Sequence, residues 1–305
     1  MVKTILVTGG NGMMGRTLQP LLPDAIYLSR KDGDLRRTDD VDQLFAAHRP
    51  THVVHLAARV GGVKENAQFN AEFLSDNLLI DANVLAAARR AGVNRVLTLL
   101  SACAFPFRPD RPSTEGDLHT GLPYEGNLGT GMAKRVLEVQ CRLMSTQDGI
   151  SCTTLTPVTM YGPHDRFDAE NSHVVGALIH KVVRSMETGE PFQVWGDGSA
   201  VRQFVYAADV ARILARLIDS DDTDHFIVAA DDGMPIQTLA ETIARMAGFA
   251  GQIKFLPKEP AGVPRKLLKS VRFHDIFPDF KFTPLEEGLR RTIEWYRSVR
   301  VTGNG

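Results

Sequence analysis

Reactive side chains follow the apolar run at residues 95–100, namely Ser101 and Cys103. A serine in that place can hydrogen-bond the carbonyl group of a substrate, and a cysteine beside it can exchange protons with a neighbouring carbon. The alternative for Cys103 is a small buried apolar side chain, which is the usual fate of a free cysteine and the better interpretation of this residue alone. Thr130 and Lys134 lie four residues apart, one turn along the same face of an expected helix. That spacing is common, so it assigns no chemistry by itself.

Short apolar runs alternate with helical periodicity through the first half of the chain. Strands are expected at residues 4–8, 24–28, 52–56, 95–100 and 151–157, and helices at 41–47, 73–91 and 131–146. Continuous apolar strands that alternate with helices predict an α/β fold with a doubly wound parallel (Rossmann) sheet covered on both faces. Ligands of such sheets bind at the carboxyl ends of the strands, where Ser101 and Cys103 are placed.

The pattern changes after Pro163 and predicts a smaller mixed α/β domain for the substrate. Its expected elements are helices at 173–188, 236–247 and 285–299 and strands at 191–195 and 252–255. The segment 204–206, with a helix at 208–219, is expected to return to the first domain. The predicted division is therefore 1–157 with 204–232 for the Rossmann domain, and 158–203 with 233–305 for the smaller one. The cleft between them is the expected site.

A glycine-rich segment, Thr8–Gly15, follows the first expected strand and opens a helix. Glycines permit the tight turn and the close backbone approach that a dinucleotide pyrophosphate requires, and the helix N-terminus then faces that pyrophosphate. A plain strand-to-helix turn would need far fewer glycines. The cofactor residues predicted from this segment are Gly9, Gly10, Asn11, Gly12, Met13 and Met14.

The second expected strand ends in Ser29, Arg30 and Lys31 rather than in an acid. An acid there would bind the ribose 2′-hydroxyl of NAD and repel a 2′-phosphate, whereas a serine with two cations accepts the phosphate. A solvated basic turn is the alternative, but the pattern favours NADP(H). The residues that fit the adenine and phosphate surroundings are Asp34, Leu35, Leu56, Ala57 and Ala58.

Composition excludes several other classes of protein. A net charge of −1 over 305 residues and a pI near 6.8 give no electrostatic reason to expect nucleic acid or an anionic membrane as partner. No apolar run is long enough to span a bilayer, and the N-terminus leads straight into a strand without a signal peptide. Three cysteines without a CxxC motif predict neither a disulfide framework nor a metal site. A cytoplasmic protein is expected.

Taken together, eight segments of the chain resemble the GDP-L-fucose synthase family. Its members are extended short-chain dehydrogenase/reductases that epimerise GDP-4-keto-6-deoxymannose at C3 and C5 and then reduce C4. The Val-Gly-Gly segment and the Ser-His-Val helix start are the most specific of the eight. Besides the glycine loop, the matching segments are Leu56–Val63, Ser101–Cys103 with Phe105-Pro106, Ala133-Lys134, Tyr161–Asp165, Asn171–Val174, Val194–Gly198 and Arg202–Phe204.

The resemblance implies a role for each matched residue. Ser101 and Lys134 would serve the reduction, and Cys103 and His173 would be the acid/base pair of the epimerisation. Without the family match, His173 is better interpreted as an ordinary residue at a helix start. The substrate is implied to be a GDP-linked 4-keto-6-deoxy sugar, hexose or heptose, and the helices from Phe73 and Gly131 are implied to form a homodimer interface. Further cofactor contacts are implied for Lys134, Pro157 and His173, and substrate contacts for Val60, Gly61, Gly62, Thr159, Lys181, Trp195, Arg202 and Lys266.

Two positions depart from the family pattern. In short-chain reductases a tyrosine precedes the lysine by four residues and passes a proton to or from the carbonyl group, but here that position is Thr130, whose hydroxyl does not titrate in the accessible range. Tyr124, in the loop before the helix, and Tyr161, in a turn, are expected to have structural roles instead. Thr159 stands where the family usually has Asn near the sugar. Two hypotheses follow. The first is an enzyme, either the full epimerase/reductase that is the family's default, with reduction weakened at Thr130, or an epimerase that keeps NADP as a structural cofactor. The second is a sensor of NADP or GDP-sugar on a retired enzyme scaffold.

Overall fold

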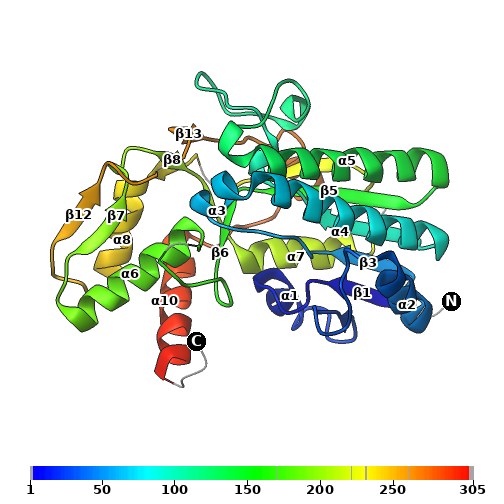
Figure 1. Ribbon diagram of the computed structural model, residues 1–305, viewed down its shortest axis with the longest axis horizontal. Helices are drawn as coiled ribbons and strands as arrows, with labels where there is room; N and C mark the ends of the chain where they lie inside the picture. The colour runs from blue at the N-terminus through cyan, green and yellow to red at the C-terminus, as the bar shows by residue number, and fades with distance from the viewer. Residues whose placement is uncertain (1–2, 170, 221, 231, 261, 302–305) are drawn as a thin grey trace.

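The protein, described here by a computed structural model over residues 3–169, 171–220, 222–230, 232–260 and 262–301, has two lobes (Figure 1). The larger lobe contains a six-stranded parallel sheet in the order β10-β5-β4-β3-β1-β2, which confirms the predicted fold class. No helix in these described ranges is both long and apolar enough to cross a membrane. The strands of the sheet are β1 (Ile5–Thr8), β2 (Ile26–Tyr27), β3 (His52–His55), β4 (Arg95–Leu99), β5 (Ser151–Pro157) and β10 (His225–Val228).

Helices cover both faces of this sheet, and its central strands are therefore apolar on both sides. Val53, Val54, Val96 and Leu97 are all 0% exposed. The chain leaves β1 for β2 on one side and continues to β3 on the other, so the carboxyl ends of β1 and β3 flank a topological switch point. Figure 1 shows α4 and α5 over one face and α1 and α7 over the other. These helices are α1 (Met13–Leu18), α4 (Asn70–Arg90), α5 (Leu128–Asp148) and α7 (Ala207–Leu217), with α2 (Thr38–His48) beside α4.

The start of α5 lies unusually close to its neighbours because two glycines leave room for their backbones. A Cβ atom on Gly129 would lie 1.9 Å from the carbonyl oxygen of Asn70, at the start of α4. One on Gly131 would lie 2.6 Å from the carbonyl oxygen of Cys103, in the short 3-10 helix η1 (Ala102–Ala104). Glycine on both sides of Thr130 thus places that residue and Lys134 against the carboxyl end of β4.

The smaller lobe has its own apolar core, centred on side chains such as Ile179, Phe192 and Leu239, each 0% exposed. Its helices begin and end close to the predicted positions. They are α6 (Val174–Thr188), α8 (Ile236–Ala247) and α10 (Leu285–Val301). Its strands are β7 (Phe192–Trp195) paired with β12 (Ile253–Leu256), and β8 (Val201–Arg202) between β11 (Met234–Pro235) and β13 (Arg265–Lys266).

Two segments join the lobes in a way that the sequence did not predict. Strand β9 (Phe204–Tyr206) pairs with β6 (Thr159–Tyr161) rather than with the main sheet. Its alternating side chains serve both cores: Val205 packs in the first, and Phe204 and Tyr206 pack in the second. Leu268 and Phe273, which the predicted division assigns to the smaller domain, also pack in the first core. The domain boundaries therefore stay a prediction.

Candidate active site

A cleft of about 930 Å³ lies at the carboxyl ends of β1, β3 and β4 and continues to the smaller lobe. Every residue that the sequence nominates for catalysis, cofactor or substrate lines it, with the exception of Gly10. The Gly10 amide donates to the carbonyl of Leu28 at 2.7 Å, and a Cβ there would lie 2.8 Å from the Tyr27 side chain. Gly10 thus packs between the loop and β2 without lining the cleft, and its assignment to the cofactor site stays a prediction.

The glycine loop fits closely over the end of β3. Gly9 has φ +72°, and a Cβ there would lie 2.8 Å from the amide nitrogen of Ala57. The Thr8 hydroxyl accepts from the amides of Leu56 and Ala57, both at 3.2 Å. The backbone therefore forms a narrow bend without side chains, which has the shape expected for a dinucleotide pyrophosphate site.

The end of β2 presents cations to the cleft, as predicted. Arg30 and Lys31 line it, and the carboxylate of Asp32 is turned back to accept from the amide and hydroxyl of Ser29 at 2.7 and 2.9 Å. Sequence reasoning missed Arg36, which also lines the cleft and contacts Asp34. Hydrogen bonds from Arg36 lower the pKa of Asp34 to about 2, so this carboxylate is paired and repels a phosphate less.

A buried polar chain links the glycine loop to Lys134. The Thr8 hydroxyl contacts His55 Nδ1 at 2.7 Å, and His55 Nε2 contacts Asp81 Oδ1 at 2.9 Å. The other oxygen of Asp81 lies 3.4 Å from Lys134 Nζ. Because Asp81 and His55 are each 1% exposed, the Lys134 ammonium has a fixed counter-charge behind it and faces the cleft in front. Neither His55 nor Asp81 was among the predicted site residues.

Thr130, at the position of the tyrosine in short-chain reductases, makes a structural hydrogen bond. Its hydroxyl donates to Asn66 Oδ1 at 2.7 Å. Asn66, in α3 (Val63–Gln68), is 5% exposed, and its amide donates to the carbonyls of Gly61 and Gly62 at 2.8 and 3.0 Å. Thr130 therefore helps to fix the Val-Gly-Gly loop that the sequence assigns to the substrate. The sequence pattern did not identify Asn66.

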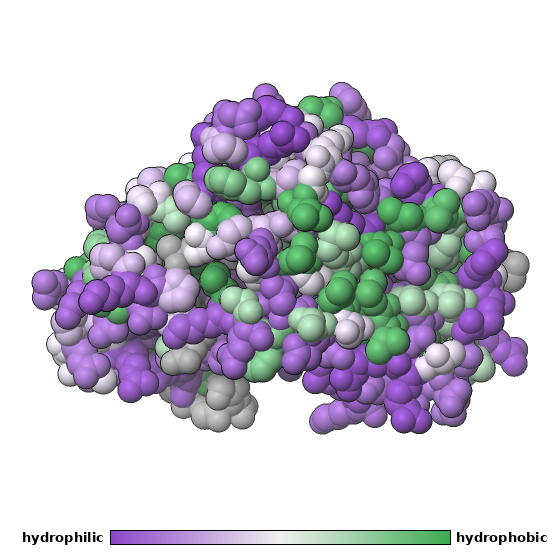
Figure 2. All heavy atoms as spheres, turned by 45° about the horizontal axis from the view of Figure 1, so that its top comes forward, coloured by the Kyte–Doolittle hydropathy of each residue, from purple (hydrophilic) through white to green (hydrophobic). Residues whose placement is uncertain are grey.

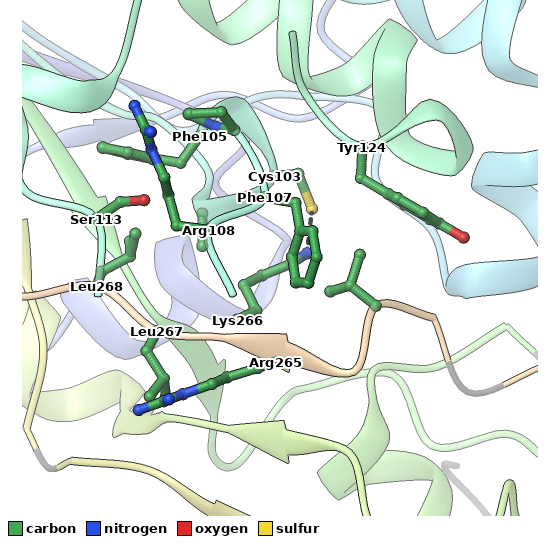
Figure 3. Close-up of a pocket in the computed structure, with 13 residues that line it drawn as sticks. Cys103, Phe105, Phe107, Arg108, Ser113, Tyr124, Arg265, Lys266, Leu267 and Leu268 are labelled. Carbon is green, nitrogen blue, oxygen red and sulfur yellow. Dashed lines mark hydrogen bonds between the residues drawn. The ribbon is translucent and has the colours of Figure 1, made fainter. Parts of the chain in front are cut away.

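Neither of the two tyrosines near this region takes the place of the missing acid. Tyr161 is 1% exposed, and its hydroxyl donates to the carbonyl of Leu285 at 3.2 Å. Tyr124 lines a separate small pocket beside Cys103 instead of the cleft (Figure 3). The buried position of Tyr161 agrees with a structural role, and the structural role of Tyr124 stays a prediction.

Cys103 lies where the cleft meets this small pocket. Its amide donates to Ser101 Oγ at 3.1 Å, and its Sγ accepts from Lys266 Nζ at 3.3 Å (Figure 3). Burial opposes ionisation, but the charge of Lys266 and the hydrogen bonds from Ser101 and Lys266 outweigh it and lower the pKa of Cys103. These contacts with Lys266 and Ser101 favour a reactive thiol over an inert apolar side chain.

His173, the residue immediately before α6, lines the same cleft as Cys103. Its side chain makes no capping hydrogen bond and is 45% exposed to the cleft. Nδ1 lies 4.0 Å from Asp165 Oδ1, and Asp165 is itself 7% exposed. Partial burial of the ring between the walls of the cleft opposes protonation of the imidazole. The Asp165 carboxylate and the nearby Cys103 outweigh this effect and raise the pKa of His173. Asp165 belongs to the matched Tyr161–Asp165 segment, yet no role was predicted for it.

Cations surround the far end of the cleft in the smaller lobe. The ammonium groups of Lys181 and Lys64 lie 4.2 and 4.3 Å from the centre of the Trp195 ring. Arg202 lines the same region and donates to the carbonyl of Val201 at 2.8 Å. This end thus combines positive charge with an aromatic face, which suits a nucleoside diphosphate.

A glycine-loop α/β sheet with its cleft at the switch point defines a dinucleotide-binding enzyme, and the comparisons agree. The family model "NAD dependent epimerase/dehydratase family" matches residues 5–229. GDP-L-fucose synthases of Sinorhizobium fredii and Dictyostelium discoideum are 34% and 30% identical to the chain. These matches cover 97% and 96% of the chain and 96% and 95% of the two relatives. The chain belongs to the GDP-L-fucose synthase family, as the sequence motifs predict.

A solved structure shows the same arrangement. The crystal structure of a GDP-L-fucose synthetase from Naegleria fowleri bound to NADP is similar with a TM-score of 0.90 and 33% sequence identity. The alignment covers 99% of this chain and 95% of that one. The similarity therefore includes the smaller lobe as well as the parallel sheet.

Proposed function

We propose that this enzyme epimerises a GDP-linked 4-keto-6-deoxy sugar, a hexose or heptose, at C3, C5 or both, with NADP(H) bound. Reduction at C4 is expected to be slow. The observation that carries the proposal is the pair Cys103 and His173, which face one cleft with pKa values moved in opposite directions. A lowered cysteine pKa favours a thiolate, and a raised histidine pKa favours an imidazolium. Both shifts are in the direction that a base and an acid of this reaction need.

The inversion needs only these two groups and an enolate stabiliser. The Cys103 thiolate takes a proton from the carbon beside the ketone, which leaves an enolate, and the His173 imidazolium gives a proton to the opposite face. The products are a thiol, a neutral imidazole and the inverted ketone, and proton exchange with water restores the charged pair. Ser101, whose Oγ accepts from the Cys103 amide, would donate its own proton to the enolate oxygen.

The residues of the glycine loop and the end of β2 fit NADP(H). Gly9 and Gly12 would admit the pyrophosphate, Arg30 and Lys31 would bind the 2′-phosphate, and Lys134 would bind the nicotinamide ribose. Bound NADPH supplies a hydride for reduction of a carbonyl. Position 130, however, lacks a titratable proton donor, because a threonine hydroxyl does not titrate in the accessible range, and here its proton is directed to Asn66. This is the physical reason to expect weak reduction.

The cations of the smaller lobe are proposed to bind the GDP part of the substrate. Arg202 and Lys181 would contact the diphosphate, and Trp195 would lie against the nucleotide. The sugar would then lie between the loop at Val60–Gly62 and Thr159. The names of the relatives, which specify GDP-L-fucose synthesis, support a GDP-sugar as substrate.

A panel of GDP-sugars followed by proton NMR in the presence of NADPH tests the proposal. Turnover or proton exchange of a 4-keto sugar is expected with the wild type and not with Cys103→Ser or His173→Ala. Binding of every GDP-sugar without exchange of any proton would contradict it and favour the sensor. No observation favours that sensor now, because Ser101, Cys103, Lys134 and His173 all line one cleft.

We also propose a homodimer that forms through α4 and α5. These two helices pack against each other, and they expose Leu79 (49%), Val136 (38%) and Leu143 (42%). Figure 2 shows apolar side chains gathered on the face that includes these helices. Light scattering that finds a monomer at micromolar concentration would refute the dimer. A cytoplasmic location, which the three free thiols favour, stays a prediction.

A further inference from the structure

Lys266 contacts the reactive sulfur directly. Its Nζ lies 3.3 Å from Cys103 Sγ, and Figure 3 shows the side chain extending from β13 towards the cysteine. Strand β13 pairs in parallel with β8, and Lys266 is the partner of Arg202 in that pairing. Two neighbouring strands therefore each contribute a cationic side chain, Arg202 from β8 and Lys266 from β13, and the Lys266 ammonium contacts the Cys103 sulfur. The family resemblance alone implies only a substrate contact for Lys266.

Cys103 borders two spaces, a small pocket behind it and the main cleft in front. The small pocket behind Cys103 has a volume of about 20 Å³, enough for a single water, and aromatic groups such as Phe107 and Tyr124 line it together with Arg108 and Arg265. On the cleft side, Ser101, His173 and Arg202 also interact with the Cys103 sulfur. Cys103 is partly buried, which strengthens the attraction between an ammonium and a thiolate relative to bulk water.

We propose that Lys266 is a positioning residue that keeps Cys103 in its thiolate form between turnovers. This inference deepens the proposed function, since Cys103 is the base of that reaction. The proposal gives the cations of the cleft different roles. Arg202 and Lys181 bind the diphosphate, and Lys266 acts through the sulfur of Cys103. When the thiolate accepts the substrate proton, Lys266 loses its counter-charge, which favours return of the proton to water and recovery of the thiolate.

The pH dependence of thiol alkylation tests this without any substrate. Iodoacetamide reacts with the thiolate, so the rate at Cys103, measured by mass spectrometry of its peptide, follows ionisation. Cys141 and Cys152 are 1% and 3% exposed and should react slowly, and Cys103→Ser identifies any background from them. We expect Lys266→Met to move the profile to higher pH and to slow alkylation at neutral pH, by about tenfold for every pH unit that the profile moves. Lys266→Arg should retain most of the wild-type profile.

Lys181→Met is the matched control. Lys181 lines the same cleft, but its ammonium lies over the Trp195 ring, so its removal should weaken substrate binding and leave the Cys103 profile unchanged. An unchanged profile in folded Lys266→Met, with thermal melting as the check on folding, would overturn the proposal. Equal changes in the Lys266 and Lys181 variants would overturn it too, because they would indicate a general field effect of the cleft.

The two proposals can fail separately. If the alkylation profile moves as expected but no GDP-sugar exchanges protons, the ion pair stands and the proposed reaction is wrong. If exchange occurs and its rate against pH is identical in wild type and Lys266→Met, the reaction stands and the role of Lys266 is wrong. In the supported case, Lys266→Met lowers kcat at neutral pH, and the acidic limb of its pH–rate profile moves to higher pH, towards the alkaline limb that His173 sets.

Discussion

Restoration of a phenol at position 130 is the most informative perturbation of this enzyme. Thr130 lines the cleft one helical turn before Lys134, whose ammonium is fixed by buried Asp81. In Thr130→Tyr the positive charge of Lys134 would lower the pKa of the new phenol, and Ser101 would lie near the carbonyl group to be reduced. We expect C4 reduction with NADPH to become faster.

The expected gain follows from what a general acid contributes. Correctly positioned proton donors accelerate reactions by about 100- to 10,000-fold, and the gain should lie within that range. The substitution removes the hydrogen bond from Thr130 to Asn66, which should lower the free energy of unfolding by about 1 kcal/mol. Asn66 retains its two bonds to Gly61 and Gly62, so the substrate loop should keep its shape.

The loss of NADPH absorbance measures this reduction, and Thr130→Phe is the matched control. The phenylalanine variant has the same ring without the hydroxyl and should reduce no faster than wild type. If the tyrosine variant binds NADPH and substrate normally but is no faster than the phenylalanine variant, the reasoning fails. The pocket would then have been rebuilt for a different reaction.

Three further predictions concern single residues. Asp165→Asn removes the charge that raises the pKa of His173; since His173 must be protonated, the alkaline limb of the pH–rate profile should move to lower pH. Arg30→Ala should weaken NADPH binding by about 1.5 to 3 kcal/mol and leave NADH binding nearly unchanged in fluorescence titrations. Burial lowers the pKa of His225 from 6.5 to about 4, so the unfolded state binds the extra proton between those values. Stability should therefore fall by about 1.4 kcal/mol per pH unit on acidification through that window, and melting curves of His225→Gln should lack this contribution.

Most of the fold follows from local pattern. The helix predicted at 73–91 is observed as α4 (Asn70–Arg90), and the strand predicted at 4–8 is observed as β1 (Ile5–Thr8). Both have apolar patterns whose period or continuity identifies them. Strand β9 shows the limit: three residues, Phe204–Tyr206, cannot show which of two cores they join, and here they join both.

The sequence pattern named residues that line the cleft, but it did not name the buried residues that support them. Cys103, His173 and Lys134 stand in segments that match the family. The supporting residues are buried polar groups whose partners are distant in sequence: Asp81 contacts His55, and Asn66 contacts Thr130 across 64 residues. One signal for Asp81 did exist, because a carboxylate three residues before Val84 lies on the expected apolar face of that helix. Its partner could only be found in three dimensions.

Deuterium exchange tests the central claim most directly. The enzyme would be incubated in D₂O with the 4-keto-6-deoxy GDP-sugar and NADPH, and NMR would follow deuterium at C3 and C5 while absorbance follows NADPH. We predict deuterium at one or both carbons with little consumption of NADPH, and loss of this exchange in Cys103→Ser. Rapid consumption of NADPH, or no deuterium at either carbon, would contradict the account.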